Sequence, residues 1–437
     1  MNIPESKLKR IVVIGAGFAG IQLIKNIDYS KFQVVLLDQN NYHTFQPLLY
    51  QVATAALEPD SIAYTVRHIF EKQAKTGNFY FRVAKINKID TEKNILFSDI
   101  GTITYDTLVI ATGSKTNYYG NENVEKYAMS MKTIPEALDL RSLILHNFED
   151  ATVSTNSQEK ERLMNYVIVG AGPTGVELAG ALAELKNHVL PNDYPELEIN
   201  KMNIHLIDAT DRVLASMSKE ASANAQNYLE KMGVKIHFGL MVKDYDGTTI
   251  TTNQQKFEAT TLIWSAGVTG NLLFGIKNSS QERGRYLVDE YNKVLGYDNV
   301  FAVGDVAAMK SDAAFPNGHP MVAQVAIQQG ENLAKNLSHQ LVNKPIKPFT
   351  YNDKGSMATI GRNKAVVDLN GFQFKGFLAW FVWMFIHLIS LVGFRNKVIA
   401  SVNWLIQYFS YNRHVRLIIR PYKRKTIEEV SSFKNIE

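Results

Sequence analysis

The chain has 437 residues, of which 46% are hydrophobic and 20% are charged, so it is long enough for two or three domains with buried cores. It contains no cysteine, which excludes disulfides, thiolate zinc sites, cysteine-ligated iron–sulfur clusters and redox-active thiol pairs. The formal net charge of +5 suits an anionic cofactor or membrane surface and is too small to indicate nucleic-acid binding. Any redox chemistry would need an organic cofactor, and we expect no metal.

The first apolar run ends in a glycine-rich turn that leads into a helical pattern. In KRIVVIGAGFAGIQLIKNI, Gly15, Gly17 and Gly20 form GxGxxG. The first glycine permits a tight turn, the second admits a pyrophosphate, and the third lets the helix pack on the strand. The helix N-terminus then presents free N–H groups to the anion. The next run, FQVVLLD, ends at Asp38, whose carboxylate can bind an adenosine ribose, so this unit predicts a dinucleotide site.

A second segment of the same kind, NYVIVGAGPTGVELAGALAEL, contains Gly170, Gly172 and Gly175, and its following strand ends at Asp208. An acid in this place favours NADH, because an NADPH site usually has a cation there for the 2′-phosphate. Arg212, four residues further on, is the one feature that favours NADPH. Two such units in one chain indicate a tightly bound dinucleotide and an exchanging one, between which a hydride passes.

The order of these segments predicts an α/β fold with two Rossmann-like dinucleotide-binding domains, the second inserted in the first. The runs TLVIATG and TLIWSAG follow the two glycine units, and NVFAVGDVAA returns the chain to the first domain. The polar stretch 149–162 is the best linker candidate. The expected domains are a first one of residues 1–120 and 294–345, a second one of residues 121–293, and a C-terminal region of residues 346–437.

Several polar residues have both a functional and a structural interpretation. Glu177, on the helix after the second glycine turn, could reach the nicotinamide side of a flavin or be a surface carboxylate favoured by the helix dipole. Asp305, which follows Gly304, could bind the ribityl chain of a flavin or simply cap a helix. Gln324 and Gln328 share one helix face and would suit a flat ring with carbonyl acceptors, although the spacing alone favours a solvated polar face.

Three more positions belong to the first expected domain. His43, beside the apolar patch FQPLLY, is a lone histidine of a kind that is more often structural than catalytic. Thr112 and Gly113, in ATG, indicate a close approach of the backbone to a cofactor.

The stretch from Gly376 to Phe394 is strongly apolar, with 19 residues and no formal charge, which is near the length of a bilayer span. Trp380, Trp383 and Trp404 suit a membrane interface. We expect helices that lie on one leaflet, with a true span and a buried core or dimer helix as the alternatives. Basic residues that suit anionic headgroups follow this stretch, namely Arg395, Lys397, Arg413, Arg416, Arg420, Lys423, Arg424 and Lys425.

The N-terminus is polar and lacks the apolar stretch of a signal peptide. We therefore expect the first domain to fold in the cytosol. With the C-terminal helices, this predicts a peripheral protein on the cytoplasmic side of the inner membrane. One or two apolar segments cannot form a proton channel, so we expect no proton pumping.

Together these segments resemble the type II NADH dehydrogenases, single-chain NADH:quinone oxidoreductases of the two-dinucleotide-binding flavoprotein superfamily. The resemblance covers nearly the whole chain and is most specific in FQPLLYQVAT, AQVAIQQG and HLISLVGFRNK. It implies a respiratory-chain enzyme that passes a hydride from NADH to N5 of FAD and then two electrons to a quinone. It also implies attachment to one membrane leaflet, and we expect a homodimer.

The resemblance implies roles for individual residues. Glu177 and Gln324 would be catalytic, and Gln324 and Gln328 would line the quinone end of the flavin. FAD would be bound by Gly15, Gly17, Phe18, Ala19, Gly20, Asp38, Thr112, Gly113, Gly304 and Asp305. NADH would be bound by Gly170, Gly172, Pro173, Thr174, Gly175, Glu177, Asp208, Ala266 and Gly267.

The missing cysteines argue against two related chemistries, those of the thiol-disulfide flavoreductases and the sulfide:quinone oxidoreductases. Two alternatives stay open. One is an NADH-dependent reductase of a ferredoxin or rubredoxin, which would need a docking surface for its acceptor and no membrane helix. The other is a flavin- and NAD-binding scaffold that signals redox state without turnover.

Overall fold

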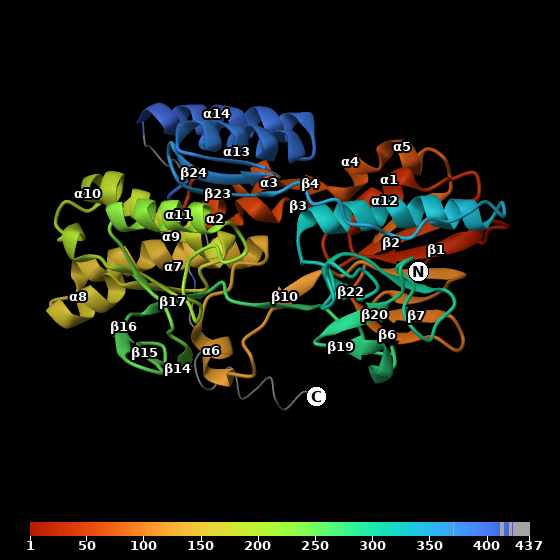
Figure 1. Ribbon diagram of the computed structural model, residues 1–437, viewed down its shortest axis with the longest axis horizontal. Coiled ribbons are helices and arrows are strands. Elements are labelled where there is room, and N and C mark those ends of the chain that lie inside the picture. Colours follow the sequence, from red (N-terminus) through yellow and green to blue (C-terminus); the bar gives the residue numbers. More distant parts are fainter. Residues whose placement is uncertain (370, 411–414, 419–421, 423–437) are drawn as a thin grey trace. The chain divides into compact units, whose positions relative to one another are not determined.

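The computed structural model describes residues 1–369, 371–410, 415–418 and 422 (Figure 1). Its contacts divide the chain into two compact units, which are described separately. Unit 1 consists of residues 1–44, 64–115 and 268–354, and unit 2 of residues 45–63, 116–267 and 355–437.

These boundaries differ from the expected ones in two places. The chain returns to unit 1 at Val268 instead of near Val294, and the segment 45–63 groups with unit 2. The C-terminal region also belongs to unit 2. Of the basic residues expected to face a membrane, Arg413, Arg420, Lys423, Arg424 and Lys425 lie outside the described residues.

Unit 1 is built on a five-stranded parallel sheet with the strand order β21-β9-β1-β2-β5. The strands are β1 (Lys9–Ile14), β2 (Phe32–Asp38), β5 (Phe79–Val83), β9 (Thr107–Ile110) and β21 (Val300–Ala302). The two central strands read as continuous hydrophobic runs because both faces of the sheet are covered.

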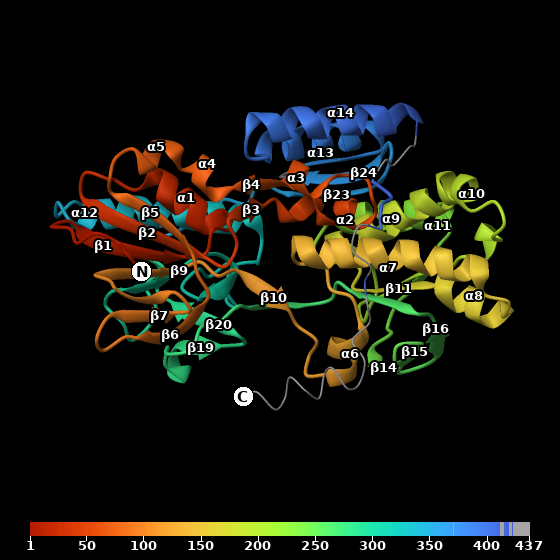
Figure 2. The same cartoon turned by 180° about the vertical axis from the view of Figure 1, so that it is seen from behind.

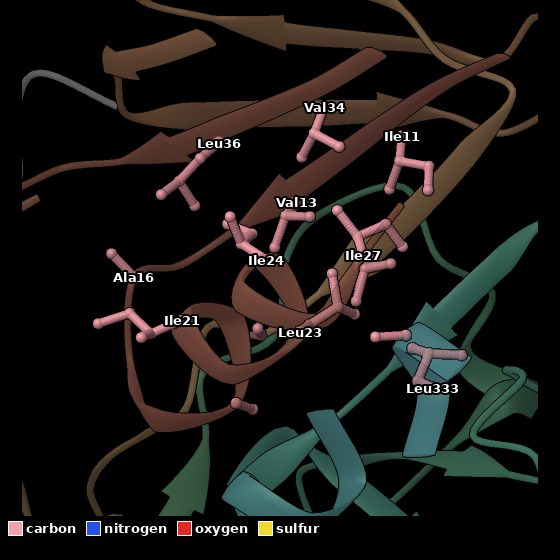
Figure 3. Packing of buried hydrophobic residues seen from close by; sticks show 14 of the residues in the cluster. Ile11, Val13, Ala16, Ile21, Leu23, Ile24, Ile27, Val34, Leu36 and Leu333 are labelled. Atoms are coloured by element: carbon pink, nitrogen blue, oxygen red, sulfur yellow. The ribbon is translucent and has the colours of Figure 1, made fainter. Parts of the chain in front are cut away.

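Two helices, α1 (Phe18–Asn26) and α12 (Ala323–Gln340), pack with one face of this sheet (Figure 3). Ile11 and Val13 of β1 meet apolar side chains of α1 there, among them Ile24. Helix α12 begins at Ala323, so Gln324 lies in its first turn.

Short antiparallel strands and their loops pack against the opposite face of the sheet, where Val12 and Ile14 point. These strands are β6 (Ile86–Asp90), β7 (Ile95–Ser98), β8 (Gly101–Thr104), β19 (Gln281–Glu282), β20 (Arg285–Val288) and β22 (Ala307–Met309), the last of which pairs in parallel with β20. The one-turn helix η4 (Gly304–Val306) follows β21 at the carboxyl edge of the sheet.

Unit 2 repeats the same plan with a four-stranded parallel sheet in the order β13-β12-β11-β17. In Figure 2 its strand β11 is labelled among the helices of this unit. Its strands are β11 (Tyr166–Val169), β12 (Ile204–Ile207), β13 (Val234–His237) and β17 (Thr261–Trp264). The helices of this part are α6 (Glu122–Tyr127), α7 (Ile134–Val153), α8 (Ser157–Met164), α9 (Pro173–His188), α10 (Leu190–Asp193) and α11 (Lys219–Lys231), and a meander is formed by β14 (Val242–Tyr245), β15 (Thr249–Thr252) and β16 (Lys256–Glu258).

The expected α/β fold with two Rossmann-like units is therefore confirmed. The predicted linker over 149–162 is wrong, because α7 continues to Val153 and α8 starts at Ser157. Asn156 caps α8 by accepting hydrogen bonds from the backbone N–H groups of Gln158 and Glu159. The polar composition of this stretch thus reflects a helix cap and two exposed helix surfaces.

The C-terminal part of unit 2 consists of the antiparallel strands β23 (Ser356–Gly361), β24 (Lys364–Leu369) and β25 (Phe372–Lys375) and the helices α13 (Phe377–Ser390) and α14 (Phe394–Ser410). The long apolar stretch forms only α13, which ends at Ser390. Gly393, whose φ of +88° is in the left-handed region that favours glycine, lies directly before α14. None of the helices among the described residues has the length and hydropathy to cross a bilayer.

The contact between α1 and α12 depends on Gly330. A Cβ at this position would collide with the carbonyl oxygen of Ala19 and lie 3.1 Å from the backbone nitrogen of Leu23. We expect Gly330→Ala to destabilise the protein by about 1–3 kcal/mol through overpacking, although alanine favours a helix by about 1 kcal/mol over glycine. Thermal unfolding would measure the loss.

The control is Lys335→Ala, an exposed site on the same helix. It should leave the melting temperature nearly unchanged. Equal or higher stability of Gly330→Ala would contradict the close contact.

Candidate functional site

The first glycine turn joins β1 to α1 and has three glycines for three different reasons. Gly15 has a φ of +109°, and a Cβ there would collide with the carbonyl oxygen of Ala111. A Cβ on Gly20 would collide with the carbonyl oxygen of Gly15. Gly17 is exposed, and nothing lies within 4 Å of where its Cβ would be. The turn is thus closed on its inner side and open at Gly17, which fits the approach of a pyrophosphate.

Asp38, at the end of β2, ties this turn to the neighbouring strand. Its Oδ2 accepts a hydrogen bond from the Ala16 N–H at 2.6 Å, and its Oδ1 accepts one from Asn40 N–H at 2.7 Å. Burial raises the pKa of Asp38, and these two backbone bonds act in the opposite direction. Each carboxylate oxygen has a second lone pair, so the group can still accept from a ribose hydroxyl.

The second turn, between β11 and α9, has the same geometry. Gly170 packs against the backbone of Ala266, and a Cβ on Gly175 would collide with the carbonyl oxygen of Gly170. Around Gly172 the space is again open, and Pro173 and Thr174 are exposed beside it at the start of α9.

Asp208 has the same place in unit 2 that Asp38 has in unit 1. Its Oδ2 accepts from the Ala171 N–H at 2.5 Å and its Oδ1 from the Thr210 N–H at 2.8 Å. Arg212 donates instead to the backbone carbonyls of Met217 at 3.0 Å and Ala215 at 2.6 Å. The Asp208 carboxylate therefore lies where a 2′-phosphate would bind, and Arg212 is bonded to its own loop, which supports NADH.

The remaining residues expected to bind FAD lie at the carboxyl edge of the unit 1 sheet. Thr112 Oγ1 donates to the carbonyl of Asn271 at 2.7 Å, and Gly113 has a φ of +67°. Asp305 Oδ2 accepts from Ser114 Oγ at 2.5 Å. These residues follow β9 and β21, which are neighbouring strands of the parallel sheet, where such folds bind their ligands.

Gln329 supports this edge and was not expected from the sequence. Its Oε1 accepts a hydrogen bond from the Gly304 N–H at 2.7 Å, and its side chain is buried. The sequence does indicate a buried role for Gln329, because it is a polar residue on the apolar side of α12, between Val325 and Leu333.

Gln324 and Gln328 bind one backbone segment of unit 1. Gln328 exchanges two hydrogen bonds of 3.0 Å with the main chain of Asn352, and Gln324 Oε1 accepts from the Lys354 N–H at 3.2 Å. The prediction that both amides share one helix face is therefore confirmed. Whether they meet a quinone stays a prediction.

Within unit 2, a cavity of about 790 Å³, including its open mouth, has Glu177 among the residues that line it. Glu177 is in the second turn of α9 and its side chain is buried. The other residues that line the cavity come from α2 (Leu49–Ala53) and the segment after it, α9, β23, α13 and α14, and include Tyr50, Gln51, Thr359, Arg362, Trp380, Trp383, Trp404 and Tyr408.

Burial raises the pKa of Glu177 to about 8, so the carboxyl is largely protonated at neutral pH. The Thr359 N–H, 3.5 Å from Oε1, and the Trp383 indole act in the opposite direction. Among the residues that the structure describes, none lies within hydrogen-bonding geometry of the indole N–H, so its effect on Glu177 is a longer-range one. The interpretation of Glu177 as a surface helix carboxylate is wrong, because its side chain is buried beside Thr359 of β23 and Trp383 of α13.

Aromatic side chains organise the rest of the cavity. Trp404 Nε1 donates to Gln51 Oε1 at 2.8 Å, and Arg362 lies 4.5 Å from the ring centre of Tyr408. The Trp383 ring stacks on His387 with a centroid distance of 4.3 Å. Indole faces can hold a flat, weakly polar ring, and the protonated carboxyl of Glu177 beside them can give that ring a proton. The expectation that Trp383 and Trp404 lie at a membrane interface is wrong, because both side chains are buried in this cavity. The sequence gives no sign of the cavity, because the residues that line it come from three distant segments.

We expect Asp208→Ala to raise the KM for NADH about 10- to 100-fold, since a carboxylate hydrogen bond to the ribose would be lost. NADPH should gain little, because Arg212 is bonded to its own loop. Steady-state kinetics with both nucleotides would measure this.

The matched control is Asp211→Ala, at an exposed acid three residues further along. It should leave both KM values unchanged. An unaltered KM for NADH in Asp208→Ala would remove Asp208 from the binding site.

Comparisons with known proteins agree with this geometry. Residues 9–330 match the family described as pyridine nucleotide-disulphide oxidoreductase, and residues 354–414 match the NDH2 C-terminal domain. The type II NADH:quinone oxidoreductases Ndh and NdhA of Mycobacterium tuberculosis are 36% and 37% identical to this chain, over 92% of it and 89% and 88% of their own lengths.

The structure of NDH2 from Plasmodium falciparum in complex with NADH has the same fold, with a TM-score of 0.86 at 21% identity. The match covers 95% of this chain and all of that one. With relatives above 30% identity along nearly its whole length, this chain belongs to the pyridine nucleotide-disulphide oxidoreductases and, within them, to the type II NADH:quinone oxidoreductases.

Proposed function

We propose that this protein oxidises NADH and reduces a quinone with bound FAD, as a respiratory-chain enzyme that pumps no protons. The relatives named above carry this activity in their names. The observation in this chain that carries the proposal is Glu177, a protonated carboxyl in a tryptophan-lined cavity of the unit with the second glycine turn.

FAD, when bound, would accept a hydride from NADH at N5 and pass two electrons on to the quinone. The chain's own contribution is to hold the two nucleotides. In unit 1 the open space at Gly17 and the N-terminus of α1 would bind the FAD pyrophosphate, with Asp38 on the ribose. In unit 2 Gly172 and Asp208 would do the same for NADH.

The cavity in unit 2 is the quinone site that we propose. Its tryptophans would contact the faces of the quinone ring, and its polar groups would bind the ring's oxygens. Glu177 would give a proton to the reduced ring, for which a carboxyl with a pKa near 8 is suited at neutral pH. Gln324 and Gln328 are not among the residues that line this cavity. Their place at the quinone end of the flavin stays a separate proposal, which includes the 352–354 segment that they bind.

Helices α13 and α14 suit the surface of a membrane that contains the quinone. Each buries one side, with Ala379 and Trp383 on α13 and Ala400 and Trp404 on α14. The opposite sides expose large apolar side chains every three to four residues, namely Phe377, Phe381, Phe385 and Ile389 on α13 and Phe394, Val398, Val402, Leu405 and Phe409 on α14. We propose that these stripes insert into one leaflet on the cytoplasmic side.

A reductase of a ferredoxin or rubredoxin is the alternative. The exposed stripes of α13 and α14 favour the quinone, because a soluble acceptor protein does not require them. Turnover of the detergent-purified protein with a quinone, compared with a ferredoxin, separates the two. A homodimer remains an expectation that size measurement in detergent would test.

The test of the proposal is NADH oxidation with a short-chain quinone by wild type, Glu177→Gln and Gln324→Ala. We expect both variants to keep their flavin and its rapid reduction by NADH. Quinone turnover should fall about 100-fold or more in Glu177→Gln, as expected when a general acid is lost. It should also fall in Gln324→Ala. Stopped-flow flavin absorbance separates the two half-reactions.

Glu220→Gln, at an exposed acid of α11, is the matched control and should behave as wild type.

Because the pKa of Glu177 is raised, its contribution to stability is complete below pH 4.5 and lost as the pH rises to about 8. Glu177→Gln should remove this loss, which is on the order of 4 kcal/mol. Normal quinone turnover in this variant would refute the role of Glu177.

Insertion of the exposed apolar side chains of α13 and α14 into a membrane can be tested separately. We expect Phe409→Ser to weaken binding to vesicles of mixed neutral and anionic lipid about tenfold, because the apolar ring would no longer be buried. Phe274→Ser, in unit 1, is the control, since the exposed fractions of the two side chains are 75% and 73%. Sedimentation with vesicles measures both. Equal losses in the two variants would contradict the assignment of this face.

A further inference from the structure

Each glycine turn contains an alanine whose backbone N–H and C=O groups are both held by hydrogen bonds. In unit 1 the Ala16 N–H is bound by Asp38, and in unit 2 the Ala171 N–H is bound by Asp208. The carbonyl groups of the two alanines are held differently. The Ala171 carbonyl accepts a hydrogen bond of 2.8 Å from the backbone N–H of Leu214.

In unit 1 a side chain performs this task. Nδ1 of His43, in the short strand β3 (Tyr42–Thr44), lies 3.0 Å from the carbonyl oxygen of Ala16. The imidazole is 4% exposed, and the edge of one ring meets the face of the other between His43 and Phe18, with centroids 5.1 Å apart. Figure 3 shows Ala16 at this turn, just before α1.

The protonation of His43 follows from its surroundings. Burial lowers its pKa to about 4, and the charge of Lys25 acts in the same direction, so the ring is neutral. A neutral imidazole carries one proton, and a carbonyl oxygen can only accept. The proton must therefore be on Nδ1, which donates to Ala16.

The consequence concerns the next N–H group along the chain. The Ala16 C=O and the Gly17 N–H belong to one planar trans peptide and point in opposite directions. A bond that draws the Ala16 carbonyl towards the buried His43 therefore turns the Gly17 N–H away from His43. Gly17 is exposed, and the space around where its Cβ would be is open. That space is the place of the pyrophosphate in the proposed function.

We propose that His43 is a positioning residue for FAD, which aims the Gly17 N–H at the pyrophosphate by holding the Ala16 carbonyl. This rests on the proposed function, in which FAD occupies the first turn. The NADH turn does not depend on it, because Leu214 supplies the corresponding bond. His43 thus gives the turn of the resident cofactor a side-chain support that the turn of the exchanging nucleotide lacks.

The experiment compares three substitutions of His43 in the purified holoenzyme by the rate of FAD release, which is followed by flavin fluorescence, and by FAD affinity after reconstitution. His43→Asn keeps an N–H the same number of bonds from Cβ as Nδ1, whereas His43→Gln moves it one bond further. His43→Leu removes it. We expect Asn to stay within about threefold of wild type, and Gln and Leu to release FAD roughly 10- to 30-fold faster.

The half-saturating NADH concentration should not change in any variant that is saturated with FAD. His68→Leu, at an exposed histidine of α4 (Val66–Ile69), is the control for the loss of an imidazole and should retain FAD as wild type does. If His43 only fills space, the order reverses, because Asn is the smallest residue of the three and would be the worst. That order, or tight FAD binding by His43→Leu, would overturn the proposal.

The outcomes separate this proposal from the function itself. A wild type without flavin refutes the proposed function. A flavin-containing wild type with an indifferent His43→Leu refutes only the role of His43. Should the variants yield too little folded protein, the melting temperatures of their FAD-free forms show whether the whole fold or only the cofactor turn is affected.

Discussion

One interaction recurs at the base of both proposed nucleotide sites, and their geometry depends on it. A carboxylate at the end of the second strand accepts the N–H of the alanine inside the glycine turn, through Asp38 in unit 1 and Asp208 in unit 2. The bond ties the turn to the neighbouring strand before any ligand arrives. Because the same oxygens can also accept from a ribose, one group organises the protein and is available to the nucleotide.

The two turns differ in how the carbonyl group of the alanine is held. Unit 1 holds the Ala16 carbonyl with a buried ring, and unit 2 holds the Ala171 carbonyl with a backbone N–H. A similar contrast holds for buried charge. The carboxyl of Glu177 is kept neutral by burial, whereas Asp208 is half-buried and bonded to two backbone N–H groups. Burial and backbone hydrogen bonds thus give Glu177 and Asp208 different roles within unit 2.

Much of this arrangement could be predicted from the sequence, because it depends on local patterns. Glycines at fixed spacings, strands ending in an acid, and Gln324 and Gln328 on one helix face all follow from periodicity and backbone sterics. The end of α13 at Ser390 was not predicted, since apolar composition says nothing about where a helix ends.

The cavity around Glu177 could not be predicted either. Gln51, Thr359 and Trp404 are far apart in the chain, and only the folding of three segments against α9 brings them together. His43 was expected to be structural, which its burial agrees with, but no local pattern indicates that it reaches the Ala16 carbonyl. Long-range contacts of single side chains carry no periodic signal, and this limits what the sequence alone can show.

Helix α12 has a mechanical consequence for unit 1. Gln329 holds Gly304 from one side of this helix, while Gln324 and Gln328 hold the 352–354 segment from another. The close contact at Gly330 keeps the helix from sliding along α1. A displacement of α12 by one residue would therefore break the bonds on both sides at once. Because these amides share one helix, a shift of α12 that moves one set moves the other as well.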